Sequence, residues 1–356
     1  MTLPHLRTFF LAVACLLWPM LAQAATPDLT AGKRIYEQTC ASCHGPAGRL
    51  PDDSPLRATM EPTDFSDPLF NSREPASDWE MVVAHGGHAM GLSEMMPPQG
   101  EALTAQDVKD VVAYIKTLAD TRDYPPGEFN FFLPIRTKKA FPEDEVVWKL
   151  RYTDRPGADA WRNVLEVEKR IGNRGQFVLE GVHDASGGRS RLSEVELGYK
   201  HVLGWNMARG WIVSGTMMVS LPTDGDESAA LSPYLSFARH WNDRWILQAS
   251  ARTTLPFDDM GGGALDLATA LHYKWSPWPR RLYPGIEFTA HAPFRSPAGD
   301  RVQYSVVPQL RFGLTRGGHV ALNVGMEVPL SDQPWDRQFH AVLLWDFADG
   351  SFFQGW

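Results

Sequence analysis

The sequence Cys40-Ala41-Ser42-Cys43-His44 has the residue types and the spacing that attach a haem group covalently. The two thiols can add across the porphyrin vinyl groups, and the adjacent histidine can then ligate the iron from below. A C-x-x-C pair can also form a redox dithiol or half of a zinc site. The zinc alternative is disfavoured because the chain has 3 cysteines in all, so no second pair exists. The motif therefore predicts one covalent haem c on Cys40 and Cys43, with His44 as an axial ligand.

A second axial ligand has to come from another part of the chain. Met96 lies in a loop and immediately precedes Pro97, whose fixed φ restrains the backbone that presents the sulfur. A neutral thioether favours ferrous iron and raises the reduction potential. A six-coordinate iron leaves no substrate position, so Met96 favours electron transfer, whereas an enzyme would need an open axial site. The alternative ligands are Met90, Met95 and, for a bis-His iron, His85 and His88.

Two terminal helices are expected to enclose this site. The first is predicted across residues 30–40, and the last follows the capping-box-like sequence that begins at Thr104. Gly32 allows the two helices to approach each other closely. Glycines before Met96 are expected to make that segment pliable. The apolar stripe of the last helix comprises Val108, Val111, Val112, Ile115 and Leu118.

Residues 26–120 resemble the class I cytochromes c, which are small electron carriers with one haem. The resemblance is carried by Gly32, Tyr36, the sequence Cys40 to Gly45, the sequence Pro62 to Phe65, Met96-Pro97-Pro98 and Tyr114. It implies an all-α domain with covalent haem at Cys40 and Cys43 and with His44 and Met96 as axial ligands.

The N-terminus reads as a secretory signal peptide over residues 1–24. Arg7 gives a positive n-region, residues 9–17 an apolar run, and Ala22-Gln23-Ala24 an A-x-A cleavage site. The formal net charge of the chain is −8, and cleavage removes the positive charge of Arg7 as well. This acidic balance argues against nucleic acid as a partner.

The C-terminal part, residues 144–350, alternates between apolar and polar residues with a period of two. From residue 338 to residue 347, for example, Phe339, Leu343 and Trp345 share one face with Phe347. Segments of about ten residues separated by turns are typical of a transmembrane β-barrel, and about twelve are found here. The strands of a soluble β-sandwich are about half as long. Tryptophans near segment ends fit aromatic girdles: Trp148, Trp161, Trp211, Trp241, Trp245 and Trp275.

The face opposite the apolar one is expected to line the barrel lumen. It carries Glu166, Glu168, Arg170, Glu180, Glu194, Glu196, Lys200, Arg252, Asp266, His272, Lys274, Glu287, His291, Arg311, Glu327 and His340. Charges of both signs in a narrow interior most simply pair with one another and hold water. The alternative, a metal ion held or guided by His272, His291 and His340, has no ligand spacing to support it.

The expected fold is therefore α + β multidomain: a small all-α cytochrome c domain (26–120), a Pro-bearing linker (121–143) and an antiparallel transmembrane barrel of about 12 strands. This architecture is similar to the fused cytochrome–porins of bacteria. A domain of this length is roughly 30 Å across and cannot enter a barrel of that size, so it should dock at the periplasmic mouth or be tethered below it.

These features predict an electron-transfer protein of the bacterial cell envelope, anchored in the lipid of the outer membrane with its haem domain in the periplasm. Its expected partners are periplasmic electron carriers or an outer-membrane donor. The alternative is an outer-membrane channel for a small solute, with a periplasmic redox module.

Overall fold

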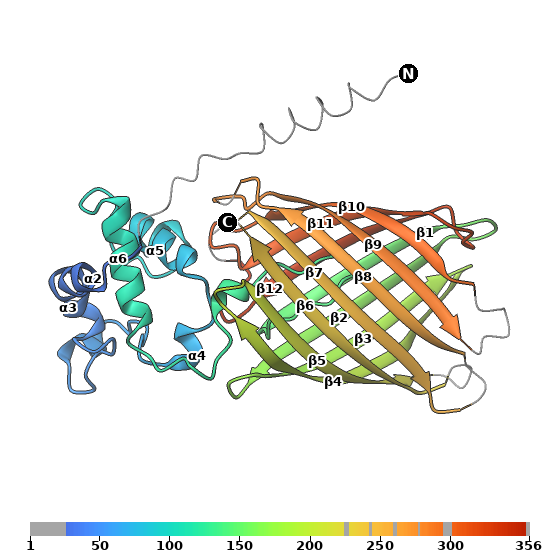
Figure 1. Cartoon of the computed structure of the whole chain (residues 1–356), viewed down its shortest axis with the longest axis horizontal. Helices are drawn as coiled ribbons and strands as arrows, with labels where there is room; N and C mark the ends of the chain where they lie inside the picture. Colours follow the sequence, from blue (N-terminus) through green and yellow to red (C-terminus); the bar gives the residue numbers. More distant parts are fainter. Residues whose placement is uncertain are drawn as a thin grey trace, which may run out of the picture.

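The computed structural model describes residues 26–223, 228–241, 244–258, 262–276, 278–294 and 301–353. A small helical domain is followed by a closed barrel of antiparallel strands, and the helical domain sits at one end of the barrel (Figure 1). Both parts of the expected fold class, the all-α domain and the antiparallel barrel, are confirmed. The predicted signal peptide at residues 1–24 lies outside the described residues.

The helical domain consists of short helices around one apolar cluster. The helices are α2 (Leu29–Ile35), the π-helical turn η1 (Tyr36–Cys40), α3 (Ala41–His44), the 3-10 turn η2 (Pro55–Ala58), α4 (Pro68–Asn71), α5 (Ala76–Ala89) and α6 (Ala105–Lys116). No helix among the described residues is long and apolar enough to cross a membrane.

The first and last helices of this domain cross at Gly32. A Cβ atom there would lie 2.0 Å from the carbonyl oxygen of Asp110, so only glycine allows this contact. Helix α6 begins with the expected capping box, in which Thr104 and Asp107 satisfy each other's backbone N–H groups. Four residues of the predicted stripe are buried in α6, namely Val108, Val111, Val112 and Ile115, whereas Leu118 follows the helix and is half-buried.

The barrel closes when the first strand pairs with the last, and the order of its strands is sequential around the circle. The strands are β1 (Glu145–Asp154), β2 (Ala160–Ile171), β3 (Gly175–Ser186), β4 (Arg189–Asn206), β5 (Trp211–Pro222), β6 (Ala230–Trp241), β7 (Trp245–Pro256), β8 (Gly263–Tyr273), β9 (Tyr283–Phe294), β10 (Gln303–Gly313), β11 (Val320–Pro329) and β12 (Arg337–Asp346). Glu145 lies opposite Asp346 in this seam. Strand β12 ends at Asp346. Phe347, which we predicted to lie on the apolar face of this strand, therefore lies one residue beyond its end.

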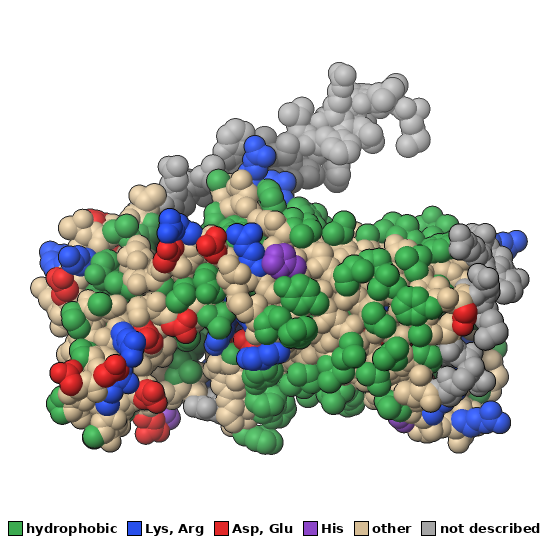
Figure 2. All heavy atoms as spheres, turned by 90° about the horizontal axis from the view of Figure 1, so that it is seen from below, with side chains coloured by type: hydrophobic (Ala, Val, Ile, Leu, Met, Phe, Trp, Pro, Cys, Tyr) green, Lys and Arg blue, Asp and Glu red, His purple; other side chains and the backbone are tan. Residues whose placement is uncertain are grey.

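The outer face of the barrel is apolar and its inner face is polar, as the alternation predicted. Side chains such as Leu165, Phe177 and Leu235 are more than half exposed, whereas Glu166, Glu180 and Glu287 are buried inside. Figure 2 shows hydrophobic side chains spread along the barrel wall, with charged side chains gathered on the helical domain and towards the barrel ends.

Each end of the barrel has connections of different lengths. The end that carries the helical domain, here called the domain end, has connections that range from residues 172–174 between β2 and β3 to residues 274–282 between β8 and β9. It also holds the start of β1 and the end of β12. The connections of the far end include residues 187–188 between β3 and β4 and residues 330–336 between β11 and β12.

The predicted linker is folded into the barrel. After the short 3-10 helix η3 (Gly127–Phe129), residues 129–141, here called the luminal segment, are largely buried. Phe129, Phe132 and Phe141 pack with apolar side chains of the inner wall, including Ile212 and Ile246. The apolar wall residues therefore have apolar partners inside the lumen.

Polar groups of the wall hold the backbone of the luminal segment. The Glu287 carboxylate accepts hydrogen bonds from the backbone N–H groups of Ile135, Arg136 and Thr137 and from the hydroxyl of Thr137, at 2.6 to 3.1 Å. Gln248 donates to the carbonyl of Phe132 at 2.9 Å. The expectation that luminal charges pair mainly with one another is thus only partly met. The reason is that an irregular segment without its own hydrogen-bond ladder needs these groups as partners.

Candidate haem site and its junction with the barrel

The predicted haem-attachment residues lie on a continuous helical stretch that ends at His44. Cys40 closes η1, and Cys43 and His44 belong to α3. Both cysteines are free thiols. Burial, and next the proximity of Cys43, raises the pKa of the Cys40 thiol to about 11. A redox dithiol needs a lowered thiol pKa, so this environment fits haem attachment better.

His44 is arranged as a neutral ligand. Its Nδ1 atom lies 3.3 Å from the carbonyl oxygen of Thr63, and because a carbonyl only accepts, Nδ1 carries the proton and Nε2 keeps its lone pair. Burial lowers the pKa of His44, which outweighs the opposite effect of the Thr63 hydrogen bond. The ring also stacks on Phe65, with centroids 4.3 Å apart. Two thiols and an unprotonated imidazole nitrogen fit a covalent haem.

The loop that contains Met96 is held against the end of α5. Gly86 has a positive φ of 78°, and a Cβ atom there would lie 3.0 Å from the carbonyl oxygen of Met96. The N–H of Gly87 donates to that same oxygen at 3.0 Å. The glycines thus serve close packing of the loop rather than the pliability that we expected. Met96 packs on the apolar cluster that Cys40 also contacts.

The alternative ligands lie in other surroundings. Met95 is 54% exposed, and Met90 is buried next to the barrel turn at Gly317. His85 stacks on Trp278 of the barrel at 4.4 Å, and the exposed His88 lies 3.4 Å from Glu94. Of these side chains, Met96 is the one that packs on the cluster around Cys40.

Comparison with known proteins identifies the helical domain. A family model described as cytochrome c matches residues 29–119. Cytochrome c-554(547) of Halothiobacillus neapolitanus is 31% identical over 93 residues, which are 26% of this chain and 97% of that protein. Through this domain, the chain belongs to the cytochrome c family.

Solved structures similar to the chain are barrels. An outer membrane channel from Pseudomonas putida F1 is 12% identical with a TM-score of 0.45, covering 60% of this chain and 99% of that one. The NanC porin is 11% identical with a TM-score of 0.43, covering 56% of this chain and 98% of that one.

Helix α3, which carries the predicted haem residues Cys43 and His44, lies on the side of the cytochrome c domain that faces away from the barrel. In Figure 1, α3 lies at the edge of the molecule farthest from the barrel, and α4 and α5 lie between α3 and the barrel. The contacts with the barrel come from residues near α5. Asp78 binds Arg281 with an oxygen–nitrogen distance of 2.8 Å, and Arg73 donates to the carbonyl of Ala348 at 3.2 Å.

The luminal histidines that were considered for a metal ion do not converge. His272 meets the edge of the Phe132 ring at 4.6 Å, His291 pairs with Asp266 at 2.7 Å, and His340 pairs with Glu327 at 3.0 Å. Within the described parts of the chain, no group of potential metal ligands includes any of them.

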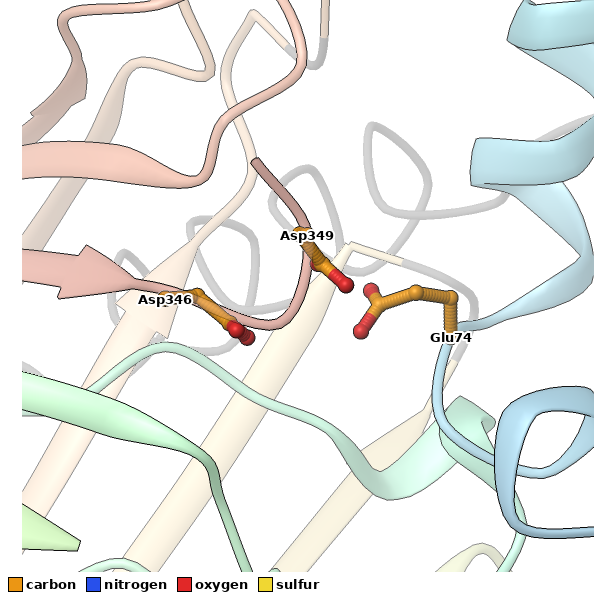
Figure 3. A group of neighbouring side chains, drawn as sticks. All are labelled: Glu74, Asp346 and Asp349. Atoms are coloured by element: carbon orange, nitrogen blue, oxygen red, sulfur yellow. The ribbon is translucent and has the colours of Figure 1, made fainter. Parts of the chain in front are cut away.

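The junction holds a group of acidic side chains that the sequence analysis missed. Glu74, Asp346 and Asp349 come together there (Figure 3). The two aspartates are near neighbours in the sequence, but Glu74 is far from both, so no local spacing could have revealed that it joins them. The luminal segment did leave a signal, because Phe129, Phe131 and Phe132 so close together are more typical of a buried segment than of a linker.

Proposed function

We propose that this chain is an electron-transfer protein anchored in the bacterial outer membrane, with one covalent haem c in a periplasmic domain. The observation that carries the proposal is the placement of the haem-attachment helix α3 on the side of the cytochrome c domain that faces away from the barrel. A haem there is open to carriers in the surrounding solution, and the barrel serves as the anchor.

The barrel surface supports the membrane anchor. An even number of strands, a closed sheet without edges and an apolar outer wall are the features of outer-membrane barrels. Exposed tryptophans on this wall include Trp148, Trp241 and Trp275. The chain enters and leaves such barrels on the periplasmic side, and the start of β1 and the end of β12 both lie at the domain end, which supports a periplasmic position for that end.

The residues of the cytochrome c domain would hold the haem as follows. Cys40 and Cys43 would provide the two covalent bonds, and His44 and Met96 the axial ligands. When bound, the haem supplies a one-electron couple, whose potential a Met/His pair raises. The Thr63 carbonyl fixes the tautomer and orientation of His44. Phe65 and the other buried apolar side chains exclude water, which also affects the potential.

Spectroscopy of the purified protein tests the axial ligands. A Met–iron charge-transfer band is expected in the oxidised protein, is expected to disappear in Met96→Ala, and should persist in the matched variant Met95→Ala. Persistence of the band in Met96→Ala would refute the assignment of this ligand. Porphyrin that can be extracted without breaking covalent bonds would refute the attachment through Cys40 and Cys43.

Sided electron transfer tests the function itself. With the protein inserted in one orientation in lipid vesicles, a membrane-impermeant reductant should reduce the haem when added on the side of the cytochrome c domain. Addition on the far side should give no fast reduction, because an apolar band of roughly 25 Å intervenes and one haem does not bridge it. Equal rates from both sides, or a protein that stays dissolved without detergent, would overturn the proposal.

The alternative function, a solute channel, is supported by a polar cavity of about 400 Å³ on the far side of the luminal segment. A second cavity lies between that segment and the cytochrome c domain. Residues of the luminal segment line both cavities, so the segment occupies the lumen through which a solute would have to pass. We therefore propose electron transfer as the main function.

A further inference from the structure

Arg151, on the inner wall of the barrel, has no partner for its charge among the described residues. It lies on β1, is half-buried and lines the cavity of about 400 Å³ on the far side of the luminal segment. Its Nε atom is buried without a hydrogen-bond partner, and no ion pair joins its guanidinium group to a carboxylate. Arg170 and Arg311, by contrast, lie over the rings of Phe141 and Phe132. Because a desolvated guanidinium group without an acceptor is costly, Arg151 points to a bound anion.

The remaining lysines and arginines that line this cavity are paired. Each of them has a carboxylate oxygen within 3.6 Å. Lys138 binds Glu180 at 3.2 Å, for example, and Arg252 binds Glu196 at 2.9 Å. The mixture of charges that we expected in the lumen therefore leaves Arg151 as the cation without a partner in this cavity, as far as the structure describes it.

The side chains on the adjacent strands do not supply a negative charge to Arg151. In the register of the sheet, Arg151 lies opposite His340 of β12 on one side and opposite Arg162 of β2 on the other. Like charges directly opposite each other in a sheet are destabilising. From inside the barrel, Arg136 of the luminal segment lines the same cavity and is 35% exposed. Three arginines thus border this part of the cavity, one of them on the luminal segment.

The two carboxylates whose charges act on Arg151, those of Glu327 and Asp184, are engaged by other groups. Glu327 binds His340 at 3.0 Å, and Asp184 binds Arg162 at 3.4 Å. The positive charges of the neighbouring arginines act on Arg151 more strongly than these two carboxylates do. The surroundings of Arg151 are therefore electropositive, and an anion is the ligand that would lower the repulsion between the arginines.

We propose that this cavity binds a small polyvalent oxyanion, held by Arg151 of the wall and Arg136 of the luminal segment. A guanidinium group presents parallel N–H donors that match the oxygens of a carboxylate or a phosphate. The cavity volume lies within the range of small-molecule sites. An anion between the two arginines would bridge the wall and the luminal segment. This inference goes beyond electron transfer and does not depend on it.

Isothermal titration calorimetry of the full-length, haem-loaded protein in detergent tests the site. Inorganic phosphate and citrate are the probes, and chloride keeps the ionic strength constant. At least one probe should bind, with one site per chain. The variants Arg151→Gln and Arg136→Gln should each weaken binding about tenfold or more, because each removes a charge-assisted hydrogen bond. The matched control Arg189→Gln removes an exposed arginine at the far end, outside the cavity, and should bind like the unaltered protein.

A second measurement reports on the luminal segment. Hydrogen exchange of residues 133–138 should slow when the probe that binds is added to the unaltered protein, and should not respond in Arg151→Gln. Haem content and elution volume show that each variant is folded. The proposal is overturned if neither phosphate nor citrate binds at millimolar concentration, if Arg151→Gln binds as tightly as Arg189→Gln, or if a bound probe leaves the exchange of the segment unchanged.

Discussion

Glu287 is the main polar anchor of the luminal segment, so its replacement should release that segment from the lumen. The side chain is fully buried in the inner wall of the barrel, on β9. In Glu287→Ala, the N–H groups of Ile135, Arg136 and Thr137 and the hydroxyl of Thr137 lose their common acceptor. The barrel strands keep their own hydrogen bonds, so the effect should concentrate on the segment.

The size of the effect follows from these bonds. A hydrogen bond to a charged group contributes about 1.5 to 3 kcal/mol to stability. In the variant, water can enter the vacated space and restore part of this hydrogen bonding. We therefore take a net loss of about 4 kcal/mol in the free energy that holds the luminal segment in place, summed over all the hydrogen bonds to Glu287. Since about 1.4 kcal/mol corresponds to a tenfold change in an equilibrium constant, the fraction of molecules with a displaced segment should rise roughly 10³-fold.

Conductance across planar bilayers measures this displacement. The unaltered protein should give small or rare conductance events, and Glu287→Ala should show frequent openings. Glu194→Ala is the matched control, because Glu194 is a luminal carboxylate that pairs with Arg162 of the wall rather than with the segment. An unaltered protein that conducts as an open pore, or equal conductance in Glu287→Ala and Glu194→Ala, would refute this reasoning.

Three further predictions concern the cytochrome c domain. Gly32→Ala should destabilise it by about 1–3 kcal/mol in chemical denaturation, because the added methyl group meets the Asp110 carbonyl at 2.0 Å; an unchanged midpoint would contradict this contact. Hydrogen bonds from the Thr104 side chain, and next from the Thr104 backbone, lower the pKa of Asp107. The ionised Asp107 carboxylate therefore stabilises the fold at pH values above the pKa that it has in the unfolded chain. This contribution to stability is lost as the pH falls through the lower pKa of the folded protein. Thr104→Ala should bring the Asp107 pKa, followed by NMR, back towards its ordinary value and cost about 1 kcal/mol of stability. Arg281→Ala removes the ion-pair partner of Asp78 and should speed hydrogen exchange at the start of α5. The haem spectrum should stay the same. A changed spectrum would contradict this prediction, because it would show that the ion pair acts on the haem site.

The features that the sequence predicted are those set by neighbouring residues. Thr104 and Asp107 form a capping box because they are three positions apart, and Cys40, Cys43 and His44 lie together because one helical stretch carries them. Alternation of apolar and polar residues similarly fixes which side of each strand faces outwards, as Phe339 and His340 show. These relations depend on backbone geometry alone and do not require knowledge of the remaining chain.

The tertiary structure alone decided where the linker goes and what the junction contains. Glu287 reaches the luminal segment across about 150 residues of chain, and Glu74 and Asp349 come from the two opposite parts of the chain. Such contacts depend on the closure of the whole sheet, which leaves no periodic trace in the sequence. For the methionines, Pro97 favoured Met96 as the predicted axial ligand, and the tertiary structure adds that Met96 packs on the cluster around Cys40 whereas Met95 is exposed.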